Sequence, residues 1–191
     1  MSASLILASN SPRRRELLSL LGISFQVDAP EVDETTSLPA SQAVHELSIR
    51  KAKAAAALHP GAYILAADTL VALDERPFGK PEDTEDAFRM LRSLSGQTHH
   101  VHTGVCVISP EGFIHTGTDS SSVRFGEMTD GEIRWYISTG EPMDKAGAYA
   151  LQGLAGMWVE EVRGTPSGVI GLPLPLTREL LQQAGFPLPF V

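Results

Sequence analysis

Short apolar segments alternate with helical patterns along this chain. Six segments are rich in apolar and β-branched residues and predict strands: 5–8, 24–29, 63–73, 98–108, 113–125 and 158–163. The fourth and fifth of them are separated only by Ser109-Pro110-Glu111-Gly112, a sequence typical of turns. We therefore expect these two strands to pair with each other.

Helical patterns fill most of the intervals between the strands. The predicted helices cover 12–21, 41–59, 84–95, 129–139 and 177–184. Ser11 is a favourable N-cap for the first helix, which Gly22 ends. Thr129 and Glu132 have the spacing of a capping box at the start of the fourth.

The interleaving of helices and strands indicates an α/β fold with a mixed sheet. Residues 30–40 form an acidic, proline-bounded loop, and residues 140–147 are too broken for regular structure. No internal repeat, low-complexity tract or linker divides the 191 residues, a length that buries a core without disulfides or a structural metal. We expect a single domain over 1–191.

Charge and hydrophobicity exclude two classes of partner. Fifteen Lys and Arg against 23 Asp and Glu give a net charge of −8, whereas proteins that bind duplex nucleic acid usually carry a basic face. No segment approaches the roughly 20 apolar residues of a membrane span. The N-terminus also lacks the arrangement of a signal peptide, in which basic residues precede a longer apolar segment. We expect no nucleic acid, no membrane and a cytoplasmic location, which the single cysteine also suits.

The turn from Ser9 to Arg14 is the first candidate for a binding site. It leads from a strand into a helix, whose N-terminus offers free N–H groups and partial positive charge to a phosphate. Arg13 and Arg14 stand in that first turn, where the helix dipole disfavours cations, so a bound anion would compensate them. A solvated basic turn explains the same residues, and taken alone it is slightly the better explanation.

Asp68 is the second candidate, because it interrupts the most apolar segment of the chain. An unpaired carboxylate is costly in such surroundings, so a partner is expected. Ligands of α/β folds bind beyond the carboxyl ends of strands, and there Asp68 would face the ligand crevice. The alternative, an aspartate that caps the next turn, is weaker because the apolar segment continues through Val71.

Three lysines and a glutamate complete the candidates. Lys80 and Lys145 sit in glycine-containing turns that suit fixed contacts with a ligand, whereas Lys51 alone is ordinary helix surface. Glu34 in the acidic loop could share a divalent cation with Asp68, since Mg²⁺ takes oxygen ligands from a few carboxylates and substrate phosphates. A solvated loop is the open alternative for Glu34.

Two other signals do not indicate a site. His99, His100 and His102 lack a second pair of ligands at a spacing typical of zinc sites, so they are predicted strand residues. Cys106 stands between two valines and is predicted to belong to the core and not to act as a nucleophile.

Taken in order, these segments resemble the signatures of the Maf family. The matching segments are 8–18 (ASNSPRRRELL), 32–34 (VDE), 51–52 (KA), 67–69 (ADT), 79–81 (GKP), 141–149 (EPMDKAGAY), 152–153 (QG) and 171–174 (GLPL). The series covers the chain nearly end to end, which makes the resemblance specific. It implies the Maf/inosine-triphosphatase-like fold, a long mixed sheet flanked by helices, with two lobes and a cleft between them.

The resemblance implies metal-dependent hydrolysis of nucleoside triphosphates to a nucleoside monophosphate and pyrophosphate. Asp68 would accept the proton and Glu34 would assist the metal or the water, so that these two carboxylates hold the divalent cation, Mg²⁺ or Mn²⁺. The residues expected to contact the substrate phosphates are Arg14, Lys51, Lys80 and Lys145, and Ser9 is expected to bind the substrate beside them. A homodimer is the expected assembly.

The resemblance also points to a substrate class. Arg13, Thr69 and Gln152 occupy three positions at which the family divides, and they resemble the branch that acts on dTTP and UTP. A sister branch that prefers methylated GTP carries Trp, Gln and Glu there. An amide offers a donor and an acceptor to the edge of uracil or thymine, and modified pyrimidine nucleotides are a related option.

Two alternative functions stay open. A non-catalytic nucleotide-binding regulator of cell division would need Arg14, Lys80 and Lys145 but not Asp68. A purine (inosine or xanthosine) triphosphatase would share the fold, although the ordered Maf segments argue against it. The presence of both Asp68 and Glu34 favours the enzyme.

Overall fold

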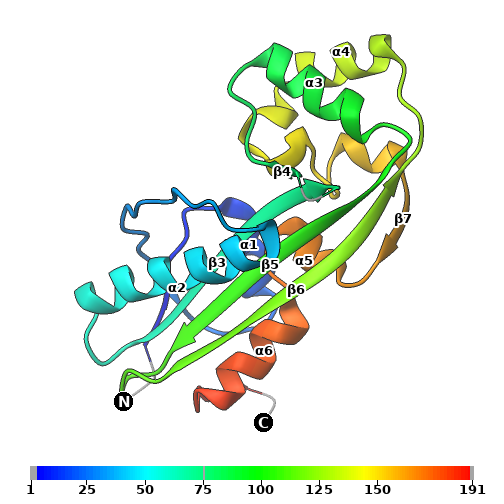
Figure 1. Cartoon of the computed structure of the whole chain (residues 1–191). Helices are drawn as coiled ribbons and strands as arrows, with labels where there is room; N and C mark the ends of the chain where they lie inside the picture. Colours follow the sequence, from blue (N-terminus) through cyan, green and yellow to red (C-terminus); the bar gives the residue numbers. More distant parts are fainter. Residues whose placement is uncertain (1–3, 75, 190–191) are drawn as a thin grey trace.

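A mixed sheet runs through the molecule (Figure 1). The computed structural model describes residues 4–74 and 76–189, and within these ranges the sheet has seven strands. The strands are β1 (Leu5–Leu7), β2 (Gln26–Val27), β3 (Tyr63–Leu73), β4 (Arg76–Phe78), β5 (Thr98–Ile108), β6 (Ile114–Phe125) and β7 (Val159–Arg163). Their order is β2-β1-β3-β5-β6-β7, with β4 paired to β3 beside this path. β1 is parallel to β2 and β3 and the other pairs are antiparallel, so the predicted mixed sheet is confirmed.

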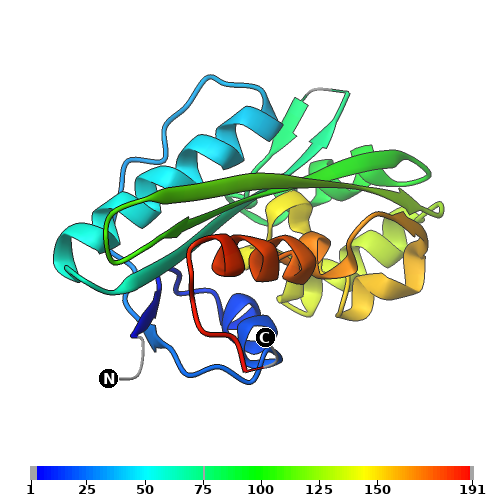
Figure 2. The same ribbon diagram turned by 90° about the horizontal axis from the view of Figure 1, so that it is seen from below.

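Helices cover both faces of the sheet and build a second lobe. The α-helices are α1 (Pro12–Ser19), α2 (Ala40–Leu58), α3 (Thr84–Leu94), α4 (Asp130–Ser138), α5 (Pro166–Ile170) and α6 (Leu174–Gln183), and the 3₁₀ helices are η1 (Glu141–Asp144), η2 (Ala146–Ala148) and η3 (Leu154–Trp158). Figure 2 shows α2 above the sheet, with α1 and α6 below it. Helices α3 and α4 lie with the 3₁₀ helices at the far end of the long strands, and together they form the second lobe (Figure 1). Within the described ranges, no helix combines the length and apolarity needed to cross a membrane.

The core is divided by the sheet and by the two lobes. On β1, Ile6 belongs to a buried cluster beneath α2, whereas Leu5 and Leu7 belong to a cluster on the face of α1 and α6. This alternation explains the uninterrupted apolar sequence of β1, because a strand covered on both faces needs apolar side chains on both. A third cluster, which includes Phe125 and Tyr136, fills the second lobe.

Most predicted elements are confirmed with small shifts of their ends. The side chain of Ser11 caps α1, and Thr129 and Glu132 form the predicted capping box of α4. The predicted strand over 24–29 is wrong in length, because only Gln26–Val27 pair, against the short β1. The expectation of an irregular segment over 140–147 is also wrong, because two 3₁₀ helices occupy most of it.

Three short elements have no counterpart in the sequence-based prediction. They are β4, α5 and η3, of three to five residues each. Elements of this length complete no hydrophobic period, so their sequences carry little signal. Two of the three reach the candidate site, because Pro77 of β4 and Val169 and Ile170 of α5 line the cavity described below.

Helix α2 packs against the sheet through a glycine. Gly104 in β5 faces the backbone of α2, and a Cβ at this position would lie 2.2 Å from the carbonyl oxygen of Val44. The absence of a side chain therefore permits a close contact between helix and strand. This contact fixes the height of α2 above the sheet, and α2 carries Lys51.

Candidate active site

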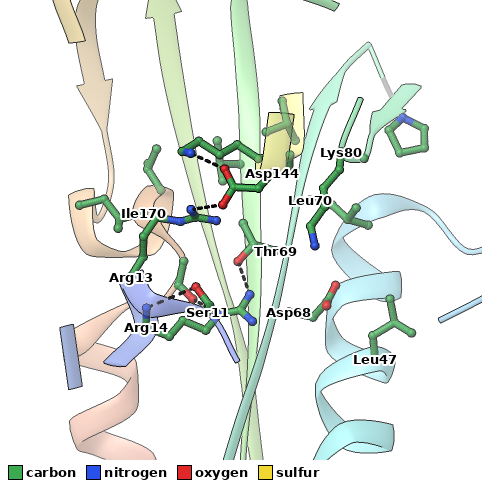
Figure 3. A pocket seen from close by; sticks show the side chains of 18 of the residues that line it. Ser11, Arg13, Arg14, Leu47, Asp68, Thr69, Leu70, Lys80, Asp144 and Ile170 are labelled. Carbon is green, nitrogen blue, oxygen red and sulfur yellow. Dashed lines mark hydrogen bonds and ion pairs between the residues drawn. The ribbon is translucent and has the colours of Figure 1, made fainter. Parts of the chain in front are cut away.

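The candidate site lies where one edge of β3 is left uncovered. β1 pairs with β3 only as far as Leu65, and β4 begins to pair with it at Val71. Between these residues, in the part of the chain that the structure describes, β3 has a neighbouring strand only on its β5 side. A cavity of about 540 Å³ opens here, and Asp68 and Thr69 lie in its wall (Figure 3). Its size is typical of small-molecule sites.

Asp68 lies in the middle of β3, as the predicted strand over 63–73 implies, and not at a carboxyl end, where ligands of α/β folds usually bind. The strand continues through Leu73. Asp68 reaches the cavity because the neighbouring strand β1 ends early. Successive residues of a strand face opposite sides. Accordingly, Asp68 is directed toward α2 and Thr69 toward Arg14 on α1 (Figure 3).

Asp68 and Glu34 share one ammonium group. Lys51 Nζ lies 2.5 Å from Asp68 Oδ1 and 2.9 Å from Glu34 Oε1. The side chains of Asp68 and Lys51 are 9% and 16% exposed, whereas that of Glu34 is 60% exposed. The buried carboxylate therefore has the partner that its apolar surroundings require, and Glu34 forms the solvent side of the group.

Three hydrogen bonds, one from each nitrogen, hold the guanidinium group of Arg14. Nε donates to the carbonyl oxygen of Gly171 at 2.8 Å, Nη1 to Ser9 Oγ at 3.1 Å and Nη2 to Thr69 Oγ1 at 3.1 Å. A guanidinium has five N–H donors, so one N–H on each terminal nitrogen remains for a ligand. Burial lowers the pKa of Arg14 below its ordinary value, but a guanidinium keeps its charge at neutral pH.

An ion pair crosses the cavity from Arg13 to the second lobe. Arg13 Nη1 lies 3.1 Å from Asp144 Oδ2, and Lys145 Nζ contacts the other oxygen of the same carboxylate. Lys145 Nζ also donates to the carbonyl oxygen of Glu141 at 2.7 Å. Burial alone would raise the pKa of Asp144, but the hydrogen bonds from Lys145 and Arg13 outweigh it and lower the pKa below 3.8. Asp144 therefore stays ionised between two cations.

The remaining walls supply one more cation, one amide and an apolar surface. Lys80 extends toward the same opening as Asp68 (Figure 3). Its loop is tied to the second lobe, because the amide of Gly147 donates to the carbonyl oxygen of Gly79 at 3.0 Å. Gln152 lies in the wall formed by the second lobe. The apolar lining includes Leu47, Leu70, Val101, Tyr149, Leu151 and Ile170.

The cavity brings together residues from the whole length of the chain. Nine of the ten residues singled out from the sequence line it: Arg13, Arg14, Glu34, Lys51, Asp68, Thr69, Lys80, Lys145 and Gln152. Ser9, the tenth, is buried behind Arg14 and accepts its hydrogen bond. Sequence reasoning overlooked Asp144, although its position beside Lys145 was a signal that could have been followed.

The carboxylates fit a hard divalent cation only together with a substrate. The described residues 4–74 and 76–189 contain no cluster of three or more His, Cys, Asp or Glu side chains suited to a metal. Asp68 and Glu34 nevertheless reach the same Lys51 ammonium, which places two carboxylates on one side of the cavity. Mg²⁺ is commonly held by one or two carboxylates together with substrate phosphates and water. These residues therefore fit a cation that arrives with a phosphate ligand.

The histidines and the cysteine lie elsewhere. His99 is buried and its Nε2 lies 2.8 Å from the hydroxyl oxygen of Tyr149, whereas His100 and His102 stack against each other at 6.1 Å between ring centroids. Cys106 has no exposed surface, and burial raises the pKa of its thiol to about 12. The predicted core position of Cys106 is confirmed.

Comparisons with known proteins agree with this geometry. The dTTP/UTP pyrophosphatase of Anaeromyxobacter dehalogenans (strain 2CP-C) is 49% identical over 193 residues, covering 100% of this chain and 98% of that protein. The dTTP/UTP pyrophosphatase of Myxococcus xanthus is 49% identical over 188 residues, covering 97% and 95%. The solved Ham1 protein of Staphylococcus aureus shares the fold, with a TM-score of 0.56 at 16% identity over 94% of this chain and 98% of the other. Residues 4–184 match the Maf-like protein family, and the chain therefore belongs to this family.

Proposed function

We propose that this protein hydrolyses nucleoside triphosphates, chiefly dTTP and UTP, to a nucleoside monophosphate and pyrophosphate. One observation carries the proposal: two carboxylates on a shared lysine face a cavity that four further cations line from both lobes. The cations are Arg13, Arg14, Lys80 and Lys145, with Lys51 between the carboxylates. The names of the curated relatives support the same activity.

The cations are the proposed binding groups for the triphosphate. Arg14 presents its two remaining N–H groups as a fork, which matches the oxygens of a phosphate group. Lys80 adds a point charge from the loop after β4, and Lys145 adds one from the second lobe. Such preorganised donors stabilise the charge that develops on the leaving pyrophosphate as the bond between the α- and β-phosphates breaks.

Asp68 is the proposed proton acceptor. A water oxygen attacks the α-phosphorus, the phosphoanhydride bond to the β-phosphate breaks, and the proton of the water moves to a carboxylate oxygen of Asp68. Lys51 fixes the orientation of Asp68 by the contact of 2.5 Å. A divalent cation, Mg²⁺ or Mn²⁺, bound by Asp68 and Glu34 would neutralise phosphate charge at this place.

Base selection is assigned to the residues around the opening. Gln152 offers both a donor and an acceptor, which suits the edge of uracil or thymine, including modified pyrimidines. Arg13 reaches the same space but is paired with Asp144. Thr69 is proposed for base selection as well, and its hydroxyl also accepts a hydrogen bond from Arg14.

Product analysis with a panel of triphosphates tests the proposal. We expect dTTP and UTP to yield monophosphate and pyrophosphate in the presence of Mg²⁺ or Mn²⁺, and chelation of the metal to stop the reaction. Asp68→Asn should lower kcat by about 10²-fold or more. Asp28→Asn is the matched control, because it removes a paired carboxylate remote from the cavity, at His59.

Each alternative has its own outcome. Release of inorganic phosphate would refute cleavage between the α- and β-phosphates. Tight nucleotide binding without turnover would favour a regulator, and a preference for inosine or xanthosine triphosphate would favour the purine enzyme. We also propose that residues 1–191 form one domain that assembles as a cytoplasmic homodimer, which light scattering should report as about twice 20.5 kDa.

A further inference from the structure

Three polar side chains form a row across the sheet behind the cavity. Thr69 in β3 is opposite Thr103 in β5, and Thr103 is opposite Asp119 in β6. Residues paired in this way have their side chains on the same face of the sheet. This face is the one approached by α1 and α5, because Thr69 contacts Arg14 and Thr103 contacts Gly168.

The hydrogen bonds along the row have only one possible direction. Thr103 Oγ1 donates to the carbonyl oxygen of Gly168 at 2.9 Å, because a carbonyl oxygen only accepts. Thr103 has then used its proton, so in the contact of 2.9 Å between the two hydroxyls Thr69 is the donor. Thr69 is left with lone pairs alone, and Arg14 Nη2 donates to them at 3.1 Å. One carbonyl group thus sets the direction of both hydroxyl hydrogen bonds, and they leave Thr69 as the acceptor that Arg14, which can only donate, requires.

The same row also supports the second contact of Arg14. Thr165, at the start of α5, donates through its hydroxyl to Asp119 Oδ1 at 2.8 Å. A Cβ at Gly168 would lie 2.3 Å from Asp119 Oδ2, so α5 sits directly on the row. Gly171 is the C-cap of α5, and its carbonyl oxygen accepts from Arg14 Nε at 2.8 Å.

Two of the three contacts that hold Arg14 therefore lead back to Thr103. The path through Thr69 is direct, and the path through Gly171 runs along α5, which Thr103 binds at Gly168. Thr103 is only 1% exposed and does not line the cavity. It can act on a ligand only through these neighbours.

We propose that Thr103 is a positioning residue that orients the guanidinium of Arg14 for the triphosphate, through Thr69 and through α5. The proposal rests on the proposed function, in which Arg14 binds a substrate phosphate. Loss of the Thr103 hydroxyl frees the Thr69 hydroxyl to rotate and leaves the Gly168 carbonyl oxygen without this donor. The two N–H groups that Arg14 directs into the cavity then lose their fixed direction.

A double-mutant cycle on kcat/KM for dTTP is the first test. Thr103→Val and Thr69→Val should each lower kcat/KM by about tenfold, because each removes a link to a charged donor. The double variant should lose less than the product of the two single losses, because both changes act on the contact between Thr69 and Arg14. Thr103→Ser keeps the hydroxyl and should restore most of the activity.

Thr177→Val is the matched control. Thr177 is also fully buried, and its hydroxyl has no hydrogen-bond partner among the described residues. The same substitution there should leave kcat/KM unchanged. An unchanged kcat/KM in Thr103→Val, or losses that multiply in the double variant, would overturn the proposal.

The second test is independent of catalysis. In nitrogen-15 NMR spectra, the Nε–H signal of Arg14 can be assigned by its disappearance in Arg14→Lys. We expect this signal to shift and broaden in Thr103→Val, but not in Thr103→Ser or Thr177→Val. If the signal responds while the wild type releases no pyrophosphate, the proposed function fails and the positioning role stands. A signal that is identical in wild type and Thr103→Val would refute the positioning role.

Discussion

His99 should make the stability of the fold sensitive to acid. Its ring has no exposed surface, contacts the hydroxyl of Tyr149 at 2.8 Å and packs edge-on against Phe125 at 5.1 Å between ring centroids. Burial, with a smaller contribution from the charge of His100, lowers the pKa of His99 from 6.5 to about 4. The native protein therefore holds a neutral imidazole in its core at neutral pH.

The sign and size of the effect follow from proton linkage. Between pH 6.5 and 4 the unfolded chain binds a proton at His99 that the folded protein excludes, so the free energy of unfolding falls as the pH falls. The full contribution is present above pH 6.5. The difference between the two pKa values corresponds to about 3 kcal/mol, of which about 2.5 kcal/mol is lost by pH 4.5.

Denaturant unfolding at pH 7.5 and pH 4.5 measures this contribution. Other groups also titrate in this range, so the informative quantity is the difference between the wild type and His99→Gln, which does not titrate. We expect the stability of the variant to fall by about 2.5 kcal/mol less than that of the wild type. The stability of His100→Gln, a change at the neighbouring exposed residue, should fall nearly as much as that of the wild type, because the charge of His100 contributes less than burial to the pKa of His99. Parallel losses in the wild type and His99→Gln would refute the linkage.

Three further expectations concern packing, reactivity and capping. Gly104→Ala should destabilise the fold by about 2–4 kcal/mol in thermal or denaturant unfolding, because its Cβ would meet the carbonyl oxygen of Val44 at 2.2 Å. Gly131→Ala, in α4 with its nearest neighbour at 3.9 Å, should instead raise stability by about 0.5–1 kcal/mol. A loss of stability at Gly131 with none at Gly104 would contradict both expectations. The buried thiol of Cys106, with its pKa raised to about 12, should react with a chromogenic disulfide at pH 8 only after unfolding; rapid reaction of the native protein would exclude the core position. Thr129→Ala should cost about 1 kcal/mol because it removes the capping box of α4, and an unchanged unfolding curve would show that the cap is dispensable.

Local signals account for the elements that were predicted correctly. β3 was predicted over its observed length, because an apolar segment bounded by turns identifies a buried strand whatever it pairs with. The capping residues of α1 and α4 act within a single turn of helix, so their effect is also visible in the sequence. β2 is shorter than its apolar segment, because pairing depends on the three residues that β1 offers.

The site shows the same division between local and long-range information. Asp68 and Arg14 could be found because each is out of place in its own segment: a carboxylate in an apolar strand and a cation at a helix N-terminus. Thr103 is an ordinary strand residue until the register places it opposite Thr69. Asp144 becomes important only because the second lobe brings it to Arg13, which is 131 positions away in the chain. Such relations depend on tertiary structure and leave no local pattern.

The three long strands have a consequence for how the protein unfolds. β3 and β5 carry apolar residues of both lobes, β6 pairs with β5 along its whole length, and the pairing of the three strands runs without interruption past the cavity. Separating the lobes would break these ladders, so the walls of the cavity are connected by the sheet itself and not by a flexible linker. The two lobes should therefore unfold as one cooperative unit. A substitution in α3 or α4, remote from any phosphate, should therefore reduce the fraction of protein with an intact cavity. The reduction should equal that caused by a substitution beneath α2 that lowers the free energy of unfolding by the same amount.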